Sequence, residues 1–451
     1  MSRSGAYLIH RKTVIEEFTL QRGTKQAFVS ESVLRKRNKE CGFTMLYSAY
    51  EFQRNLLAGA SALANAGAEL LNNPANPFSY FGGGPILASA LDVFAHAAAP
   101  RGKPDFNLPT TQIDGQTVAV TEVIEARKPF GQLRHFTREG AHPSDPRLLI
   151  VAPMSGHFAT LLRGTVERLL PGHDIWITDW RDARNVPLSD GRFDLDDYID
   201  YLIEWLEHIG PGAHMLAVCQ PSVPCYAAAC LMAADKNPAR PRTLTMMGGP
   251  IDTREAPTAV NIMATERPLG WFEQNVVATV PFNYPGNGRR VYPGFMQLAG
   301  FMTMNLGDHL TSHWEMFKHL VDGDEDSADA TKKFYEEYRS VCDMTAEFYI
   351  QTVSEVFQKH SLPKGELMHR GRRVDPAALS DVALLAVEGE RDDISGLGQT
   401  KAALKISTGL PESHKKYYMA KGAGHYGIFN GSKWRTKVAP VVEEWIARHN
   451  G

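Results

Sequence analysis

The stretch that decides the fold runs from His214 to Ala234 and reads HMLAVCQPSVPCYAAACLMAA. It begins as a short apolar run, breaks at Cys219-Gln220-Pro221 and resumes as an alanine-rich segment. A short apolar run that ends at such a break is typical of a buried strand, and the alanine-rich remainder favours a helix. The pattern therefore predicts that Cys219 lies at a sharp turn from a strand to a helix.

Similar apolar runs alternate with helical segments on both sides of this stretch. The runs are RLLIVAP at 147–153, HDIWITDW at 173–180, RTLTMMGGP at 242–250, VALLAVEG at 382–389 and KKYYMAKG at 415–422. Strands that alternate with helices are typical of βαβ units, which predict a parallel sheet covered by helices on both faces. Before them, Asp114-Gly115 separates two alternating segments and predicts a β-hairpin.

The alternation of strands and helices stops near Pro257 and resumes near residue 381, so an insertion separates two parts of the core. The segment between is rich in aromatic residues and methionine, and we expect it to cap the carboxyl edge of the sheet, where open α/β sheets bind ligands. The expected parts are a basic extension at 1–44, a helical segment at 45–105, the first part of the α/β core at 106–256, a mostly helical cap at 257–380 and the rest of the core at 381–451.

The composition is that of an ordinary globular protein. The chain has 48 Lys and Arg against 51 Asp and Glu, a net charge of −3, which gives no overall attraction to nucleic acid or an anionic membrane. It has no unbroken apolar run of about 18 residues and no secretory pattern at its start. Its five scattered cysteines are typical of a reduced, cytosolic protein. We expect the basic extension to be a solvated tail rather than an arm for an acidic partner.

Cys219 occupies the position of a nucleophile elbow, where the side chain is held at the amino end of a helix. The helix dipole favours a negative charge there, so a thiolate is stabilised. Ala217 provides the small neighbour that an elbow needs, and Pro221 suits the first residue of a helix, whereas Pro224 has no explanation from the sequence. The competing interpretation makes Cys219 a small buried side chain, which we adopt for Cys225 and Cys230. Ser222 ranks well below Cys219 as a nucleophile.

Two further residues have the order that a nucleophile at Cys219 requires. In α/β hydrolases the acid and the base follow the nucleophile, each directly after a strand. Asp392, with Asp393 beside it, follows one predicted strand, and His425 lies on a glycine-flanked loop after the next. The fold class is therefore α/β, with an α/β-hydrolase fold: a mostly parallel central sheet flanked by helices, with a helical cap inserted between late strands.

The same scheme predicts the oxyanion donors. One is the backbone N–H of Gln220, the residue after the nucleophile. The other comes from the loop after the strand at 147–153, where Met154 is the first choice and Ser155 the second. No metal-ligand pattern is present in the sequence, so we expect a reaction without metal or organic cofactor.

From about Met45 to the C-terminus the chain resembles the intracellular poly(3-hydroxybutyrate) depolymerases of bacteria. The most specific pieces are VCQPSVP around Cys219, GERDDISGLGQT around Asp392 and GAGHYGIFNG around His425. The resemblance implies a Cys219-Asp392-His425 triad that cleaves a polyester stored in cytoplasmic granules, with the amorphous granule surface as partner. The aromatic and methionine-rich insertion suits contact with that surface.

Two alternatives remain open at this point. The chain also looks like a distant relative of polyhydroxyalkanoate synthases, which share a cysteine triad on the same fold, so polymer synthesis or another acyl transfer is the first alternative. The synthases carry a G-x-C-x-G elbow, which this chain lacks, and that difference favours degradation. The second alternative is a protein that binds granules without catalysis. The sequence does not predict whether water or a thiol accepts the acyl group, nor the oligomeric state.

Overall fold

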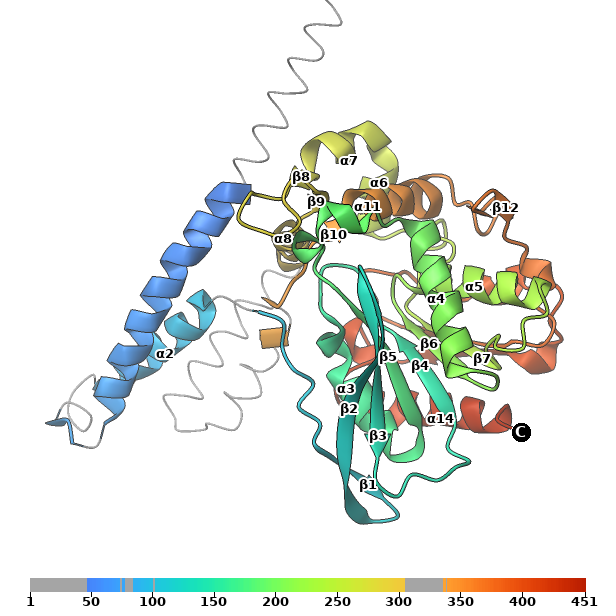
Figure 1. Cartoon of the computed structure of the whole chain (residues 1–451), viewed down its shortest axis with the longest axis horizontal. Helices are drawn as coiled ribbons and strands as arrows, with labels where there is room; N and C mark the ends of the chain where they lie inside the picture. Colours follow the sequence, from blue (N-terminus) through green and yellow to red (C-terminus); the bar gives the residue numbers. More distant parts are fainter. Residues whose placement is uncertain (1–46, 74, 78–83, 100–101, 305–335, 338) are drawn as a thin grey trace, which may run out of the picture.

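The computed structural model of the chain describes residues 47–73, 75–77, 84–99, 102–304, 336–337 and 339–451 (Figure 1). The predicted basic extension at 1–44 lies outside these residues. Within them, no helix is long and apolar enough to cross a membrane.

A nine-stranded sheet with the order β1-β2-β3-β5-β4-β6-β7-β13-β14 forms the centre of the molecule. The six strands from β5 to β14 in this order are parallel, whereas β1, β2 and β3 are antiparallel additions at one side. The strands are β1 Thr110–Ile113, β2 Gln116–Lys128, β3 Gly131–Arg138, β4 Arg147–Val151, β5 Asp174–Trp180, β6 His214–Val218, β7 Thr243–Met247, β13 Ala383–Gly389 and β14 Lys415–Ala420.

The central strands are short, apolar and buried because helices cover both faces of the sheet. Every residue of β6, β7 and β13 is buried, as expected for parallel strands that alternate with helices. Figure 1 shows α4 and α5 on one face and α14 on the other. The helices of the core are α3 Arg163–Leu169, α4 Leu195–Ile209, α5 Ser222–Ala234, α12 Ala402–Ile406, α13 Gly431–Lys433 and α14 Ala439–Arg448. The predicted α/β-hydrolase fold is therefore confirmed.

The predicted hairpin before the core is also confirmed. Strands β1 and β2 pair in antiparallel register from Thr110↔Ala119 to Ile113↔Gln116. Asp114 and Gly115 form the turn with φ of 49° and 78°, and two consecutive residues of positive φ give the turn that fits the twist of a tight hairpin.

The insertion between β7 and β13 contains more than the predicted helices. Its helices are α6 Ala259–Glu266, α7 Leu269–Asn275, α8 Gly294–Met304 and α11 Ala346–Thr352, which a π-helical turn at Val353–Gln358 continues. A small antiparallel sheet joins β8 Ala278–Thr279, β9 Arg290–Tyr292 and β10 Met344–Thr345, and β11 Met368–His369 pairs with β12 Arg372–Arg373. The sequence missed these strands because two or three residues are too few to display an alternation.

Two helices at the N-terminal side form a hairpin that lies apart from the sheet (Figure 1). A long helix spans 47–72, and α2 spans Gly84–Ala98, both within the segment 45–105 that the sequence predicted to be helical. The Ser61 hydroxyl donates to the carbonyl of Ala95 at 2.7 Å and joins the two helices. At the other end the Tyr47 hydroxyl donates to Asp343 Oδ2 at 2.5 Å, so the hairpin is fastened to the insertion.

Candidate active site

Cys219 lies between β6 and α5, in the tight turn that the sequence predicted. Its φ is 67°, a left-handed conformation that is uncommon for a residue other than glycine. The turn is held because the Cys219 N–H donates to the carbonyl of Met247 at 2.7 Å, while the Cys219 carbonyl accepts from the Ser222 N–H at 3.1 Å. The residue is half-buried. A strained backbone that its surroundings enforce is a feature of functional sites.

The residue at which α5 begins explains both prolines after the elbow. Pro221 is the N-cap of α5, and the helix begins one residue later than the sequence suggested, at Ser222. The first bond inside the helix runs from the Cys225 N–H to the Pro221 carbonyl at 2.9 Å. Pro224 is thus the third helical residue, where an N–H has no acceptor within the helix. Its missing N–H costs no hydrogen bond, which resolves the difficulty that the sequence left.

His425 and Asp392 meet at the carboxyl edge of the sheet, after β14 and β13. Nδ1 of His425 lies 2.8 Å from Oδ2 of Asp392, and both side chains are almost fully buried. Oδ1 of Asp392 accepts from the N–H groups of Ile394 at 2.9 Å and Ser395 at 2.8 Å, which fixes the carboxylate. The acid that contacts His425 is therefore Asp392, while Asp393 is its neighbour in the chain.

The charge of His425 is coupled to Cys219. Burial alone would lower the pKa of His425, but the charges of Cys219 and Asp392, and the side-chain hydrogen bonds that His425 makes with both, raise it well above its usual value. The imidazole is hydrogen-bonded to the Asp392 carboxylate, and its pKa is raised by both Cys219 and Asp392. A raised pKa keeps the His425 ring charged, as a base that has taken the proton of a nucleophile would be.

A side-chain hydrogen bond joins the two residues that were predicted to supply the oxyanion donors. The Met154 N–H donates to the side-chain Oε1 of Gln220 at 3.4 Å, a long hydrogen bond. Among the described residues the backbone N–H of Gln220 has no acceptor. Ser155, the second choice for the loop donor, follows Met154 and is half-buried. The sequence did not suggest that the Gln220 side chain would lie at the Met154 N–H.

The other candidate nucleophiles are buried away from solvent. Ser222 is fully buried, and its hydroxyl has no hydrogen-bond partner among the described residues. Cys225 and Cys230 are also buried, and burial raises the pKa of both thiols well above the usual value. These two cysteines pack in the core as the sequence suggested. Among the described residues, no group of three or more His, Cys, Asp or Glu side chains could hold a metal ion.

Two glycines directly after β7, which the site requires, were not predicted from the sequence. Gly248 has a φ of 60°, and a Cβ there would lie 2.9 Å from Ile428 Cδ1, 3.0 Å from His425 Cε1 and 3.2 Å from Asp392 Oδ2. At Gly249 a Cβ would lie 2.0 Å from the Ser222 hydroxyl, against the first turn of α5. The glycine pair in MMGGP, directly after an apolar run, is the signal that could have revealed them.

We expect Gly248→Ala to reduce ester hydrolysis at least about tenfold, because the methyl group would displace the His425 ring from Asp392. Gly371→Ala is the matched control: its φ is 79°, so it has the same backbone strain, but nothing lies within 4 Å of the added carbon. Initial rates on a soluble ester measure both. Equal losses in the two variants would contradict the crowding at Gly248.

Comparison with known proteins gives a family for the C-terminal part of the chain. Residues 248–450, a little under half of the chain, match the family model described as "PHB de-polymerase C-terminus". The match contains Asp392 and His425, while Cys219 precedes it. A search of curated protein sequences found no match.

The solved structures to which the chain is similar are distant in sequence. The chain is 12% identical to a monoacylglycerol lipase from Paleococcus ferrophilus, with a TM-score of 0.41 and coverage of 68% of this chain and 96% of that one. A thermophilic esterase from Thermogutta terrifontis has 13% identity, a TM-score of 0.39 and coverage of 78% and 100%. A meta-cleavage product hydrolase from Pseudomonas fluorescens IP01 has 12% identity, a TM-score of 0.40 and coverage of 75% and 97%.

Proposed function

We propose that this chain is an ester hydrolase that cleaves poly(3-hydroxybutyrate) through a Cys219-His425-Asp392 triad, and the match of residues 248–450 to the "PHB de-polymerase C-terminus" model supports this substrate. The substrate would be the amorphous polymer of granules stored in the cytoplasm. The observation that supports the triad is the 2.8 Å hydrogen bond between His425 and Asp392, together with the pKa of His425, which Cys219 and Asp392 both raise. This is the geometry that a nucleophile, its base and the orienting acid need.

The reaction would proceed in two halves. The Cys219 thiolate attacks an ester carbonyl, and the oxyanion accepts hydrogen bonds from the N–H groups of Gln220 and Met154. The His425 imidazolium then protonates the leaving alkoxide, so the ester C–O bond breaks and a thioester remains on Cys219. In the second half His425 takes a proton from water, the hydroxide attacks the thioester, and the acid leaves while the sulfur departs as thiolate. Asp392 holds the imidazole ring throughout.

Release of soluble acid from protein-free amorphous poly(3-hydroxybutyrate) granules tests this function. The proposal predicts continuous release of 3-hydroxybutyrate or its short oligomers by the purified protein. Polymer growth from a hydroxyacyl-CoA without acid release would indicate a synthase instead. Granule binding with no turnover, unchanged in Cys219→Ala, would indicate a protein that only binds the polymer.

The Gln220 side chain gives a separate prediction for acyl transfer. Its Oε1 accepts the Met154 N–H that the oxyanion would need, so the substrate must displace it. Since a hydrogen bond contributes about 1 kcal/mol net, we expect Gln220→Ala to acylate Cys219 up to several-fold faster. Gln220→Glu, whose carboxylate is a stronger acceptor, should acylate more slowly than wild type. Single-turnover rates on a soluble ester measure this order. A loss of more than about tenfold in Gln220→Ala would mean that the side chain supports the loop.

A further inference from the structure

The N-terminal hairpin exposes a row of large apolar side chains on one face of helix 47–72. Phe52 is 72% exposed, Leu56 66%, Leu63 77% and Leu70 63%. We refer to these four residues as the outer stripe. Their spacing of four, seven and seven residues keeps them within an arc of about 40° along roughly 27 Å of helix. Contiguous exposed apolar surface of this kind marks an interaction site.

The surface around the outer stripe carries almost no charge. Of the exposed residues in helix 47–72, Glu69 is the only charged one. The exposed residues of α2 are all uncharged, and they include Ile86, Leu87 and Phe94, each about half exposed. The exposed residues of these two helices therefore include none of the basic residues that an anionic membrane or a nucleic acid attracts, and Glu69 alone is acidic.

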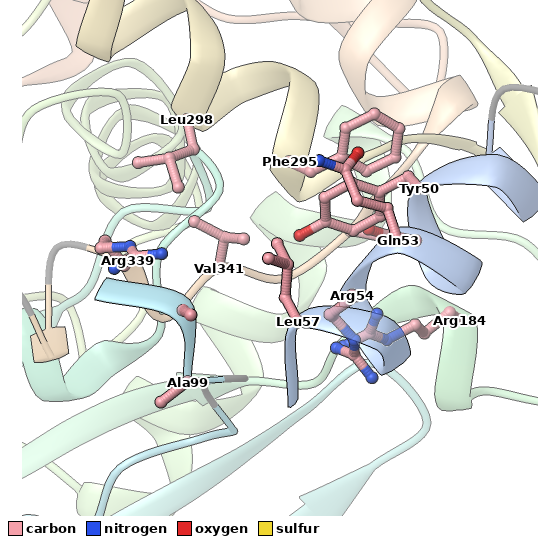
Figure 2. A pocket seen from close by; sticks show the side chains of 12 residues that line it. Tyr50, Gln53, Arg54, Leu57, Ala99, Arg184, Phe295, Leu298, Arg339 and Val341 are labelled. Carbon is pink, nitrogen blue, oxygen red and sulfur yellow. The ribbon is translucent and has the colours of Figure 1, made fainter. Parts of the chain in front are cut away.

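The opposite face of helix 47–72 is already in use, so the two faces have different roles. Figure 2 shows Tyr50, Arg54 and Leu57 turned toward a pocket that Phe295 and Val341 line on the other side. The ring of Tyr50 stacks on Phe295 with centroids 4.0 Å apart, and further along the helix the Ser61 hydroxyl donates to the α2 backbone.

The contacts of the opposite face fix the hairpin on the insertion, so the outer stripe points away from the insertion. Figure 1 shows the long helix extending away from the sheet and the insertion, with α2 beside it. The outer stripe therefore suits an extended partner surface that contacts the helix along its length. A small ligand would need a pocket instead. An uncharged apolar surface of any extent complements it, and an amorphous aliphatic polyester is such a surface.

We propose that the outer stripe of the N-terminal hairpin docks the protein on the uncharged surface of the polyester, and so holds the insertion and the site near the solid substrate. This inference rests on the proposed function for the identity of the polymer. Docking buries the leucines and the phenylalanine against ester and methyl groups, which removes apolar area from water without placing charges in an apolar contact.

The double variant Leu56→Glu/Leu63→Glu tests the docking surface. Glutamate is a good helix former, so the helix is retained while two charges enter the outer stripe. The matched control Asn55→Glu/Asn65→Glu adds the same charge at exposed positions of the same helix outside the stripe. Both pairs are made in full-length Cys219→Ala, so that binding is measured without turnover, and separately in the active protein.

Cosedimentation with protein-free amorphous poly(3-hydroxybutyrate) granules measures binding. We expect the stripe variant to bind at least about tenfold more weakly than the control, and in the active protein to degrade granules more slowly while soluble esters are hydrolysed at the control rate. Failure of the wild-type protein to release acid from granules would count against the proposed function and not against docking, because binding is measured in the inactive background.

Three results would overturn the docking proposal. The first is granule binding that is equal in the stripe variant and the control. The second is binding to neutral or anionic phospholipid vesicles that is as strong as binding to the polymer. The third is a wild-type dimer in sedimentation that the stripe variant loses, because the outer stripe would then be an interface between two copies of the chain.

Discussion

Cys219→Ala is expected to lower the rate of ester hydrolysis at least about a thousandfold, the scale of loss when a nucleophile is removed from a triad. The physical reason is that Cys219 is the half-buried thiol at the strained elbow and interacts with the charge of His425. Alanine keeps the backbone of the turn and removes only the sulfur. Rates on granules and on a soluble ester should fall together, because the loss lies in the bond-making step.

Cys225→Ala is the matched control for this substitution. It removes a thiol from α5 only six residues away, but that thiol is fully buried in the hydrophobic core. We expect its activity to remain within about threefold of wild type, with a modest loss of stability from the small cavity. Near-wild-type activity in Cys219→Ala would remove the sulfur from the mechanism.

Asp392→Asn is expected to reduce acyl transfer by about a thousandfold or more, as when the orienting acid of a triad becomes an amide. The carboxylate accepts from His425 Nδ1 at 2.8 Å, and an amide would no longer enforce that orientation and tautomer. Asp393→Asn removes the same charge one residue away and should retain most of the activity. The kinetic measurement is a rate of acylation at substrate saturation for both variants.

The pH profile of acylation tests the effect of Asp392 on the pKa of His425. The pKa of His425 is raised by Cys219 and Asp392 against the lowering effect of burial, so the imidazolium persists above the usual range. The proton for the leaving group is thus present at neutral pH and is lost as the pH rises through the His425 pKa. The stability that the His425–Asp392 ion pair contributes is lost over the same rise in pH. In Asp392→Asn one cause of the raised pKa is absent, so the alkaline limb should move to lower pH. An unmoved limb would contradict this coupling.

The sequence predicted the core because its strands alternate with helices and end in chemically distinctive residues. The apolar runs at 147–153 and 382–389 are recognisable as strands because both faces of each strand are buried. Parallel strands end at the same edge of the sheet, so Cys219, Asp392 and His425, which each follow a strand, are expected at that edge. What escaped prediction depends on contacts between segments far apart in the chain. Gly248 is required by the ring of His425, and no local pattern reveals that packing.

Short elements and side-chain positions were also beyond the sequence. Strands of two residues, such as β10, exist because Met344 and Thr345 pair with β9 across the insertion. The start of α5 was misplaced by one residue, which made Pro224 look unfavourable. The segment 45–105 was predicted to be helical, but the alanine-rich sequence of its first helix did not show which face packs and which is exposed. The outer stripe became apparent only from burial.

The claim on which the account depends is that the sulfur of Cys219 makes the covalent bond to the acyl group. The most direct measurement is acid quenching during turnover of a soluble 3-hydroxybutyrate ester, followed by peptide mass analysis. The account predicts a hydroxyacyl group on the peptide that contains Cys219, located at this residue by fragmentation, released by hydroxylamine and absent in Cys219→Ala. An acyl group on Ser222, or full turnover with none on Cys219 at any quench time, would contradict it.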